Sequence, residues 1–180
     1  MIIPANEERW AVYFLRMAQL AASKSKDTTK VGCVLVEPNS YRVLSLGFNG
    51  IPRGVQDSRE DHPERYQRPE KYLYVVHAEA NAVAAAAASG TIIKNSVAYC
   101  TLHPCIECTK LLIQAGITTV FYLKEPESLQ TQSNNWRELF PIARMIAKEA
   151  GVSFIECELH ANAPLEDVQA TYLKSMIAVN

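Results

Sequence analysis

The sequence lacks an excess of charge of either sign. Its 180 residues include 18 lysines and arginines against 19 aspartates and glutamates, so the net charge is -1 at pH 7, and no segment is a basic run. A protein that follows a nucleic-acid backbone usually carries a basic excess or a basic stripe. The charge balance therefore argues against a nucleic-acid partner and favours a small ligand.

Long hydrophobic runs are also absent. No apolar stretch reaches the roughly 18 to 20 residues of a membrane-spanning helix, and Met1-Ile2-Ile3-Pro4 has neither the basic nor the apolar region of a signal peptide. We therefore expect a cytoplasmic protein with no membrane partner. Because no repeat or linker divides the chain and 48% of it is hydrophobic, residues 1–180 are predicted to form a single domain.

Cysteines are few and follow no disulfide framework. Three of the five, Cys33, Cys100 and Cys157, lie singly within apolar runs, which is typical of buried free thiols in a reducing compartment. The other two, Cys105 and Cys108, have a different pattern, because they are three residues apart and directly follow Pro104.

Apolar periodicity and turn residues predict alternating helices and strands. The first two strands, 31–36 and 42–47, are separated by a turn and are expected to form a hairpin. Residues 55–72 are the most polar part of the chain and are interpreted as an exposed insertion. The remaining strands are predicted at 96–101, 117–123 and 152–157, and the helices at 6–22, 77–89, from Pro104 onward, 134–150 (where Pro141 either kinks the helix or marks its start) and 165–177. Five strands alternating with helices imply an α/β sheet with helices on its faces.

The most informative stretch is His77-Ala78-Glu79, followed after 24 intervening residues by Pro104-Cys105-Ile106-Glu107-Cys108. One histidine and two cysteines are zinc ligands, and a zinc with three protein ligands keeps its fourth position open for water, as catalytic sites do. The pattern H-x-E…P-C-x-x-C is typical of zinc-dependent nucleobase deaminases, in which the glutamate is the general acid and base and not a ligand.

Both halves of this pattern are predicted at helix N-termini. A helix N-terminus favours negative charge and lowers thiol pKa, so Cys105 and Cys108 are expected to bind as thiolates. A structural zinc knuckle would need a fourth ligand from His62, His103 or His160, and a redox pair would leave His77-Ala78-Glu79 without a role. The sequence therefore predicts one catalytic zinc held by His77, Cys105 and Cys108.

This site predicts a hydrolytic mechanism. Zinc lowers the pKa of a bound water from about 16 to about 7, and Glu79 is expected to move protons from that water to a ring nitrogen and then to departing ammonia. His103 has three interpretations: a fourth ligand, a substrate contact or part of the pocket wall. We favour the wall, because a fourth ligand would displace the reactive water.

Over residues 8–125 the sequence resembles the deoxycytidylate (dCMP) deaminase family. The zinc pattern alone indicates only the wider cytidine deaminase-like superfamily. Other stretches of the sequence narrow the resemblance to the dCMP deaminase family. The stretches that carry the resemblance are Ser25-Lys26-Asp27 with Val31-Gly32, Gly47-Phe48-Asn49-Gly50-Ile51-Pro52-Arg53-Gly54, residues 101–110, and Gln114-Ala115-Gly116-Ile117. The resemblance implies a three-layer α/β/α fold with a five-stranded mixed sheet, and conversion of dCMP and water to dUMP and ammonia. It also implies a homo-oligomer, commonly a hexamer, activated by dCTP with magnesium and inhibited by dTTP.

The resemblance also implies residue roles. Besides the catalytic Glu79, it implies substrate contacts at Ser25, Lys26, Asn49, Ala78, His103 and Tyr122, and an effector-nucleotide site at Phe48, Gly50, Arg53 and Gly54. The two contacts of the Ser-Lys pair would be to the 5′-phosphate, although Ser23-Lys24 offers a second register. His103 stands where the family often has an aromatic residue. Some members hold a second, structural zinc with ligands from the insertion, but residues 50–76 contain no cysteine, so none is predicted here.

Two rival functions share parts of the pattern. A nucleic-acid editing deaminase has the same zinc motif but is disfavoured by the neutral charge and by the absence of an aromatic and basic groove. A non-catalytic nucleotide sensor could keep the fold, but the intact ligands and Glu79 argue against it. A polynucleotide-binding assay separates the first rival, and a turnover assay the second.

Overall fold

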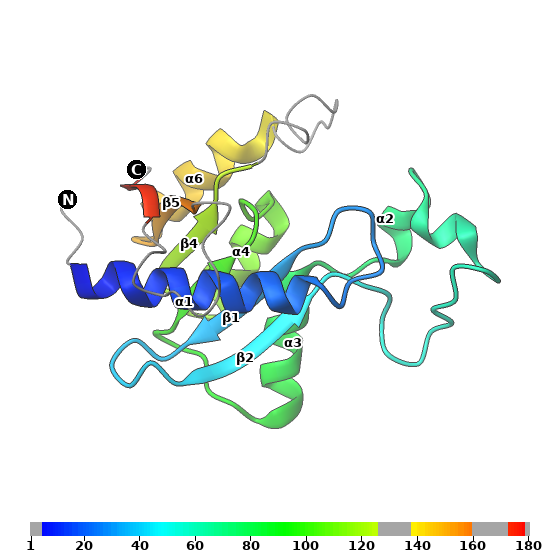
Figure 1. Ribbon diagram of the computed structural model, residues 1–180, viewed down its shortest axis with the longest axis horizontal. Coiled ribbons are helices and arrows are strands. Elements are labelled where there is room, and N and C mark those ends of the chain that lie inside the picture. The colour runs from blue at the N-terminus through cyan, green and yellow to red at the C-terminus, as the bar shows by residue number, and fades with distance from the viewer. Residues whose placement is uncertain (1–4, 126–137, 160–172, 179–180) are drawn as a thin grey trace.

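The computed structural model describes residues 5–125, 138–159 and 173–178. The helices are α1 (Ala5–Ala22), the short α2 (Lys71–Tyr74), α3 (Ala78–Ser89), α4 (Ile106–Gln114) and α6 (Phe140–Glu149), with a 3₁₀ turn at Pro63–Tyr66. The strands are β1 (Gly32–Val36), β2 (Val43–Phe48), β3 (Val97–Cys100), β4 (Thr119–Leu123), β5 (Ser153–Leu159) and β6 (Leu173–Ala178) (Figure 1). No helix among these residues is both long enough and apolar enough to span a membrane.

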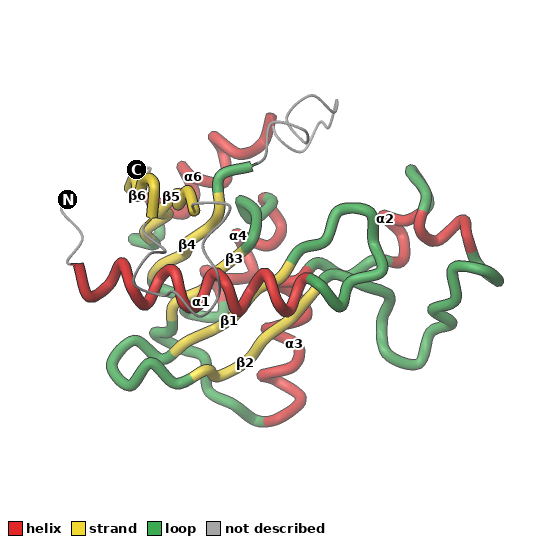
Figure 2. Tube along the Cα trace, viewed as in Figure 1, coloured by secondary structure: helices red, strands yellow, loops and turns green. Residues whose placement is uncertain are grey.

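The strands form one mixed sheet in the order β2-β1-β3-β4-β5-β6 (Figure 2). Strand β1 is antiparallel to both β2 and β3, strands β3, β4 and β5 are parallel, and β6 is antiparallel to β5. The predicted hairpin of β1 and β2 and the five predicted strands are therefore present. Because parallel strands need crossover connections, α4 follows β3 and α6 precedes β5.

Two predictions about helices need revision. The helix predicted at 165–177 is wrong where the structure describes it, since residues 173–178 form β6; residues 165–172 lie outside the described residues. A short apolar run does not distinguish helix from strand by periodicity, and here pairing with the otherwise open edge of β5 decides. Of the helix predicted at 134–150, residues 134–137 lie outside the described residues; in the described part the helix begins at Phe140 with Pro141 in its first turn, so the proline lies at its start.

Helices cover both faces of the sheet, as the predicted three-layer class requires. On one face, α1 packs Ala11, Phe14, Leu15 and Ala18 against buried strand residues including Val34, Tyr99 and Phe121. On the other face, α3, α4 and α6 contribute Ala82, Leu112 and Ala147 to a second cluster around Leu35, Ala98 and Val120. Alternation of side chains across the sheet separates the two cores.

Gly47 lets helix α3 approach the sheet closely. It lies in β2 under α3, and a Cβ built on it would overlap the carbonyl oxygen of Ala78 and the amide nitrogen of Ala82. Both partners are backbone atoms of α3, which cannot rotate away. The absence of a side chain at this position therefore fixes how closely the N-terminal turn of α3 packs on β2.

We expect Gly47→Ala to lower the free energy of unfolding by about 1–3 kcal/mol or more, because the added methyl group must displace α3 from β2. Gly50→Ala is the matched control, since its Cβ would meet nothing closer than a side-chain atom of Phe48 at 3.9 Å. Urea unfolding of the two variants measures the difference. Equal stability of the two would contradict this account of the packing.

Residues 55–72 extend away from the sheet, at the right of Figure 1. Only Tyr66 and Lys71 are buried in this stretch. The Arg59 guanidinium lies 5.0 Å from the centre of the Tyr66 ring, and that of Arg65 lies 4.9 Å from the Tyr74 ring. Contacts between arginines and aromatic rings therefore help to hold the insertion, together with ion pairs such as Lys26–Asp57. The insertion ends at α2, whose first residue is six positions before His77.

Candidate active site

Two helix N-termini bring the predicted metal ligands together. His77 is the N-cap of α3 and Cys105 is the N-cap of α4, and both have the extended backbone that precedes a helix. His77 Nδ1 lies 3.4 Å from the Sγ atoms of both Cys105 and Cys108. The three ligand atoms all lie within 4.8 Å of one another, and they form the one such cluster of histidine, cysteine and acidic side chains in the described part of the chain.

The cluster fits a zinc ion. A tetrahedral zinc at about 2.3 Å from sulfur and about 2.0 Å from nitrogen separates these atoms by about 3.5 Å, and the observed separations are 3.4 Å. Exposure decreases from His77 through Cys105 to Cys108, which is buried. The ligand set is therefore closed on the protein side and open toward solvent, as a site with a reacting water requires.

The electrostatics of the donors match a soft divalent cation. The pKa of Cys105 falls to about 4, first because Cys108 donates a hydrogen bond to its sulfur and also because His77 does. The pKa of Cys108 rises, first because of the hydrogen bond to Cys105 and then because of burial. A thiolate beside a second thiol and an imidazole is a donor set that zinc selects.

Glu79 lies in the first turn of α3, two residues after His77. Its side chain is buried, and burial raises its pKa above the usual range. It lines the same cavity as His77. A carboxyl group that shares a wall with the metal ligands, without belonging to their cluster, is placed to carry protons.

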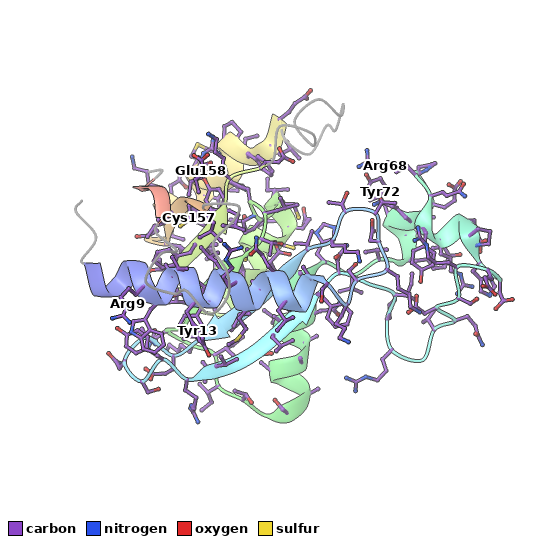
Figure 3. All side chains as sticks on the ribbon, in the orientation of Figure 1. Arg9, Tyr13, Arg68, Tyr72, Cys157 and Glu158 are labelled. Carbon is purple, nitrogen blue, oxygen red and sulfur yellow. The ribbon has the colours of Figure 1, made fainter. Side chains whose placement is uncertain are left out.

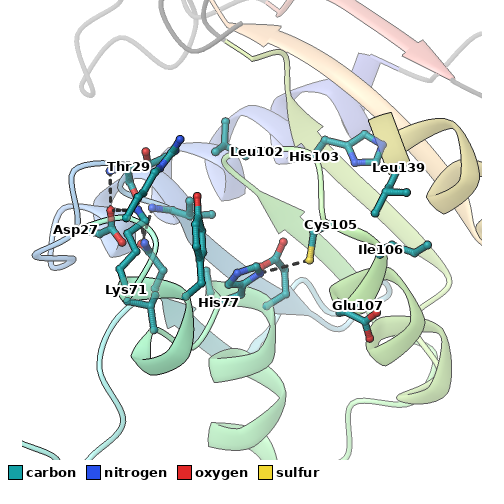
Figure 4. Close-up of a pocket in the computed structure, with 17 residues that line it drawn as sticks. Asp27, Thr29, Lys71, His77, Leu102, His103, Cys105, Ile106, Glu107 and Leu139 are labelled. Atoms are coloured by element: carbon teal, nitrogen blue, oxygen red, sulfur yellow. Dashed lines mark hydrogen bonds and ion pairs between the residues drawn. The ribbon is translucent and has the colours of Figure 1, made fainter. Parts of the chain in front are cut away.

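The cavity beside these residues has a volume of about 500 Å³, which is in the usual range for a small-molecule site. Its walls come from the loop before β1, the end of β2, the insertion, the start of α3, the segment before α4 and the segment before α6 (Figure 4). The lining residues are Asp27, Thr29, Val31, Asn49, Arg68, Lys71, Tyr72, Val75, His77, Ala78, Glu79, Leu102, His103, Cys105, Ile106, Glu107 and Leu139.

Three of the six predicted substrate contacts line this cavity, namely Asn49, Ala78 and His103. The Asn49 amide is engaged with the loop before β1, since its oxygen accepts from the Val31 amide at 2.7 Å and its nitrogen donates to the Thr29 carbonyl at 2.9 Å. Asn49 therefore fixes the backbone of one cavity wall.

The other three predicted contacts are not among the lining residues. Ser25 is buried and its hydroxyl accepts a hydrogen bond from the Asp27 amide. Lys26 is exposed and points to Asp57, whose carboxylate is 2.9 Å away. Tyr122 is buried behind His103, with 4.7 Å between the ring centres.

His103 is part of the cavity wall and not of the ligand cluster. Its Nδ1 donates to the Pro104 carbonyl at 2.7 Å, so Nε2 is free of a proton and accepts from Arg144 at 3.4 Å. Its ring stacks on Phe140 with 4.0 Å between centres. Burial lowers its pKa to about 4. The loop before α4 is thereby fixed to α6 by a neutral histidine.

The predicted effector residues lie outside this cavity. Gly50 exchanges backbone hydrogen bonds with Val76, the residue before His77, at 3.1 and 2.9 Å. The Phe48 carbonyl accepts from the Asn81 side chain of α3 at 2.8 Å. Arg53 and Gly54 are exposed, and Gly54 has a φ of +83°. The Gly-rich bend is thus tied directly to the start of the catalytic helix.

Four charged residues that line the cavity were given no role from the sequence, namely Asp27, Arg68, Lys71 and Glu107. Arg68 and Lys71 come from the insertion. Asp27 comes from the loop in which Ser25 and Lys26 were the expected phosphate contacts. Lys71 Nζ lies 2.8 Å from Asp27 Oδ1, and both side chains are buried. The position of Lys71, six residues before His77, could have indicated that it lies near the site. Its partner Asp27 is 44 residues away in sequence, so only the fold shows that the two side chains meet.

A His-Cys-Cys cluster at two helix N-termini, with a buried glutamate beside it on a three-layer sheet, defines a zinc-dependent deaminase of the cytidine deaminase-like class. Comparison with known proteins agrees. Residues 8–124 match the family model described as the cytidine and deoxycytidylate deaminase zinc-binding region. The chain belongs to this family, so the family and the fold class predicted from the motifs are confirmed.

Individual relatives give the extent of the similarity. A probable deoxycytidylate deaminase of Drosophila melanogaster is 38% identical over 124 residues, which are 64% of this chain and 60% of that protein's length. The deoxycytidylate deaminase of Homo sapiens is 33% identical over 150 residues, 81% of this chain and 78% of that protein. Among solved structures, the dCMP deaminase of cyanophage S-TIM5 in complex with dCMP and dUMP is 26% identical with a TM-score of 0.60, covering 87% of this chain and 99% of the phage chain.

Proposed function

We propose that the protein deaminates dCMP hydrolytically, giving dUMP and ammonia. The observation that carries the proposal is the position of the three-ligand cluster and Glu79 on one wall of a cavity of about 500 Å³. The similarity to deoxycytidylate deaminases, including one solved with dCMP and dUMP, supports the choice of substrate. The five free cysteines support a reducing, cytoplasmic location.

Each residue of the site has a chemical task in this reaction. His77, Cys105 and Cys108 would hold a zinc ion, whose Lewis acidity would activate a water molecule. Glu79 would take one proton from that water and pass it to the ring nitrogen beside the amine while the water oxygen bonds to the amine-bearing ring carbon; it would then take the second proton from the added hydroxyl and give it to the amine, so that the carbon–nitrogen bond breaks, ammonia leaves and a carbonyl remains. Burial of Glu79 keeps bulk water from competing for this proton. Ala78 and His103 contribute walls for the base, and Asn49 holds the loop that faces it.

We further propose regulation by nucleotides, with activation by dCTP and magnesium, inhibition by dTTP, and assembly as a homo-oligomer, namely a hexamer. Phe48, Gly50, Arg53 and Gly54 are the proposed effector contacts. The hydrogen bonds between Gly50 and Val76 support the proposal, because a ligand that moved this bend would move the residue next to His77. The exposed Arg53 offers a cation for a triphosphate.

Ammonia release from dCMP, CMP, deoxycytidine, dCTP and short single-stranded DNA tests both proposals. We expect turnover of dCMP above all other compounds, raised by dCTP with magnesium and suppressed by dTTP. Turnover of dCMP with neither response would retain the reaction and reject the regulation. Reaction of the oligonucleotide alone would support an editing deaminase instead, and zinc binding without any turnover would support a sensor.

A further inference from the structure

The buried ion pair between Asp27 and Lys71 has no role in the deamination step. The side chains are 2% and 8% exposed, and Lys71 Nζ lies 2.8 Å from Asp27 Oδ1. The Asp27 carboxylate also accepts from the Thr28 hydroxyl at 3.2 Å and the Thr29 amide at 3.0 Å. Withdrawing an ion pair from water is costly and is weak evidence for stability by itself. A pair buried at the edge of a binding cavity therefore calls for a functional explanation.

Lys71 has donors left for a ligand. An ammonium group carries three N–H donors, and among the described residues one of them goes to Asp27 and none to another side chain or carbonyl. Lys71 lines the cavity that holds Glu79. Asp27 accepts several hydrogen bonds and so fixes the ammonium, while the remaining N–H groups are available on the cavity side.

The positively charged side chains of the cavity lie on the side of Lys71, which favours binding of an anion there. The described residues that line the cavity include one lysine, Lys71, and one arginine, Arg68. Both come from the end of the insertion. Asp27, Thr29 and Lys71 lie together on one side of His77, whereas His103 and Leu139 lie on the other side of Cys105 (Figure 4). That other side holds apolar groups and the exposed Glu107, whose carboxylate would repel a phosphate.

The two cations differ in burial. Arg68 is exposed, and its guanidinium lies 5.8 Å from the ring centre of Tyr72 on the outer part of the insertion (Figure 3). Lys71 is buried and fixed by Asp27. A charged hydrogen bond from a pre-positioned donor in a desolvated wall is stronger than one from an exposed side chain. Lys26, which the resemblance implied for the phosphate, is directed to Asp57 outside the cavity.

We propose that Lys71 binds the 5′-phosphate of the substrate and thereby makes the site specific for nucleotide over nucleoside, and that Asp27 is the positioning residue that holds its ammonium. This inference rests on the proposed function and names a specificity-determining contact of the same site. It also gives the insertion a task, because the segment that carries Lys71 leads directly into His77. A phosphate bound here would thus contact the chain six residues before a zinc ligand.

The test compares dCMP with deoxycytidine, as the ratio of the two kcat/KM values from ammonia release. We expect Lys71→Met to lower this ratio by about 10- to 100-fold, since a hydrogen bond to a charged group is lost, while deoxycytidine turnover changes little. Lys71→Arg is expected to restore most of the ratio. Lys30→Met is the matched control, because Lys30 is an exposed lysine outside this cavity. Lys26→Met tests the rival phosphate contact.

A second set of variants separates positioning from folding. Asp27→Asn combined with Lys71→Met removes both charges together, so no unpaired charge is buried, and its ratio should equal that of Lys71→Met alone. Asp27→Asn alone should lower the ratio less than Lys71→Met does. An unchanged ratio in Lys71→Met, or a fall in Lys26→Met in its place, would overturn the proposal. Calorimetric titration with dUMP and deoxyuridine measures the same preference without turnover, so it tests Lys71 even if wild-type protein fails to deaminate dCMP.

Discussion

Replacement of Glu79 by glutamine is expected to reduce kcat for dCMP by about 10²- to 10⁴-fold, the usual contribution of a positioned proton carrier. Glutamine has nearly the same shape but neither accepts the proton of the water nor delivers one to the ring nitrogen. Because the cluster of ligand atoms comes from His77, Cys105 and Cys108 and not from Glu79, the variant should keep its zinc. Substrate binding should change much less than turnover, since the pocket retains its volume.

Three measurements on the same preparation check this expectation: ammonia release, zinc content and thermal unfolding. Glu149→Gln is a suitable control, because it makes the same chemical change at an exposed position at the end of α6. Loss of zinc together with activity would assign Glu79 a role in the metal site. Retention of more than about a tenth of the wild-type rate would assign the proton transfer to another group.

The metal site was predictable because its geometry is local. His77 and Glu79 are two residues apart at the start of one helix, and Cys105 and Cys108 share the first turn of another. Strand ends bring such turns to the same edge of an α/β sheet, so two short motifs were sufficient to place the ligands together. Short motifs of this kind predict the local geometry without knowledge of contacts to distant parts of the chain.

The basic side of the cavity, which we propose binds the phosphate, was not predictable for the opposite reason. In sequence, Lys26 and Lys71 are both lysines in polar stretches, and the Ser-Lys-Asp resemblance favoured Lys26. The fold turns Lys26 outward to Asp57 and leaves Asp27 to pair with Lys71 from the insertion. The difference depends on a contact across 44 residues, which neither composition nor periodicity records. Strand β6 was missed similarly, since its state is set by pairing with β5.

Removal of a zinc ligand is expected to have the other large effect. Cys108→Ala should lower the zinc content from about one per chain to well below that value, and deamination to below about 1% of the wild-type rate, because two ligands hold the metal poorly and its Lewis acidity is lost. Cys108 is buried and alanine is small, so the sheet and α4 should remain folded. Metal analysis after dialysis and an ammonia assay measure the two effects.

Cys157→Ala is the matched control for this variant, since Cys157 is also buried but lies in β5, away from the insertion and the cavity (Figure 3). Burial raises the pKa of Cys157 to about 12, so it remains a thiol and should not contribute to zinc binding. A metal that binds only the folded state adds about 2.7 kcal/mol of stability at 100 times its Kd. A chelator should therefore lower the melting temperature of wild-type protein and Cys157→Ala but leave that of Cys108→Ala unchanged. A melting temperature that falls equally in all three would show that the chelator acts elsewhere, whereas unchanged zinc content in Cys108→Ala would remove this cysteine from the ligand set.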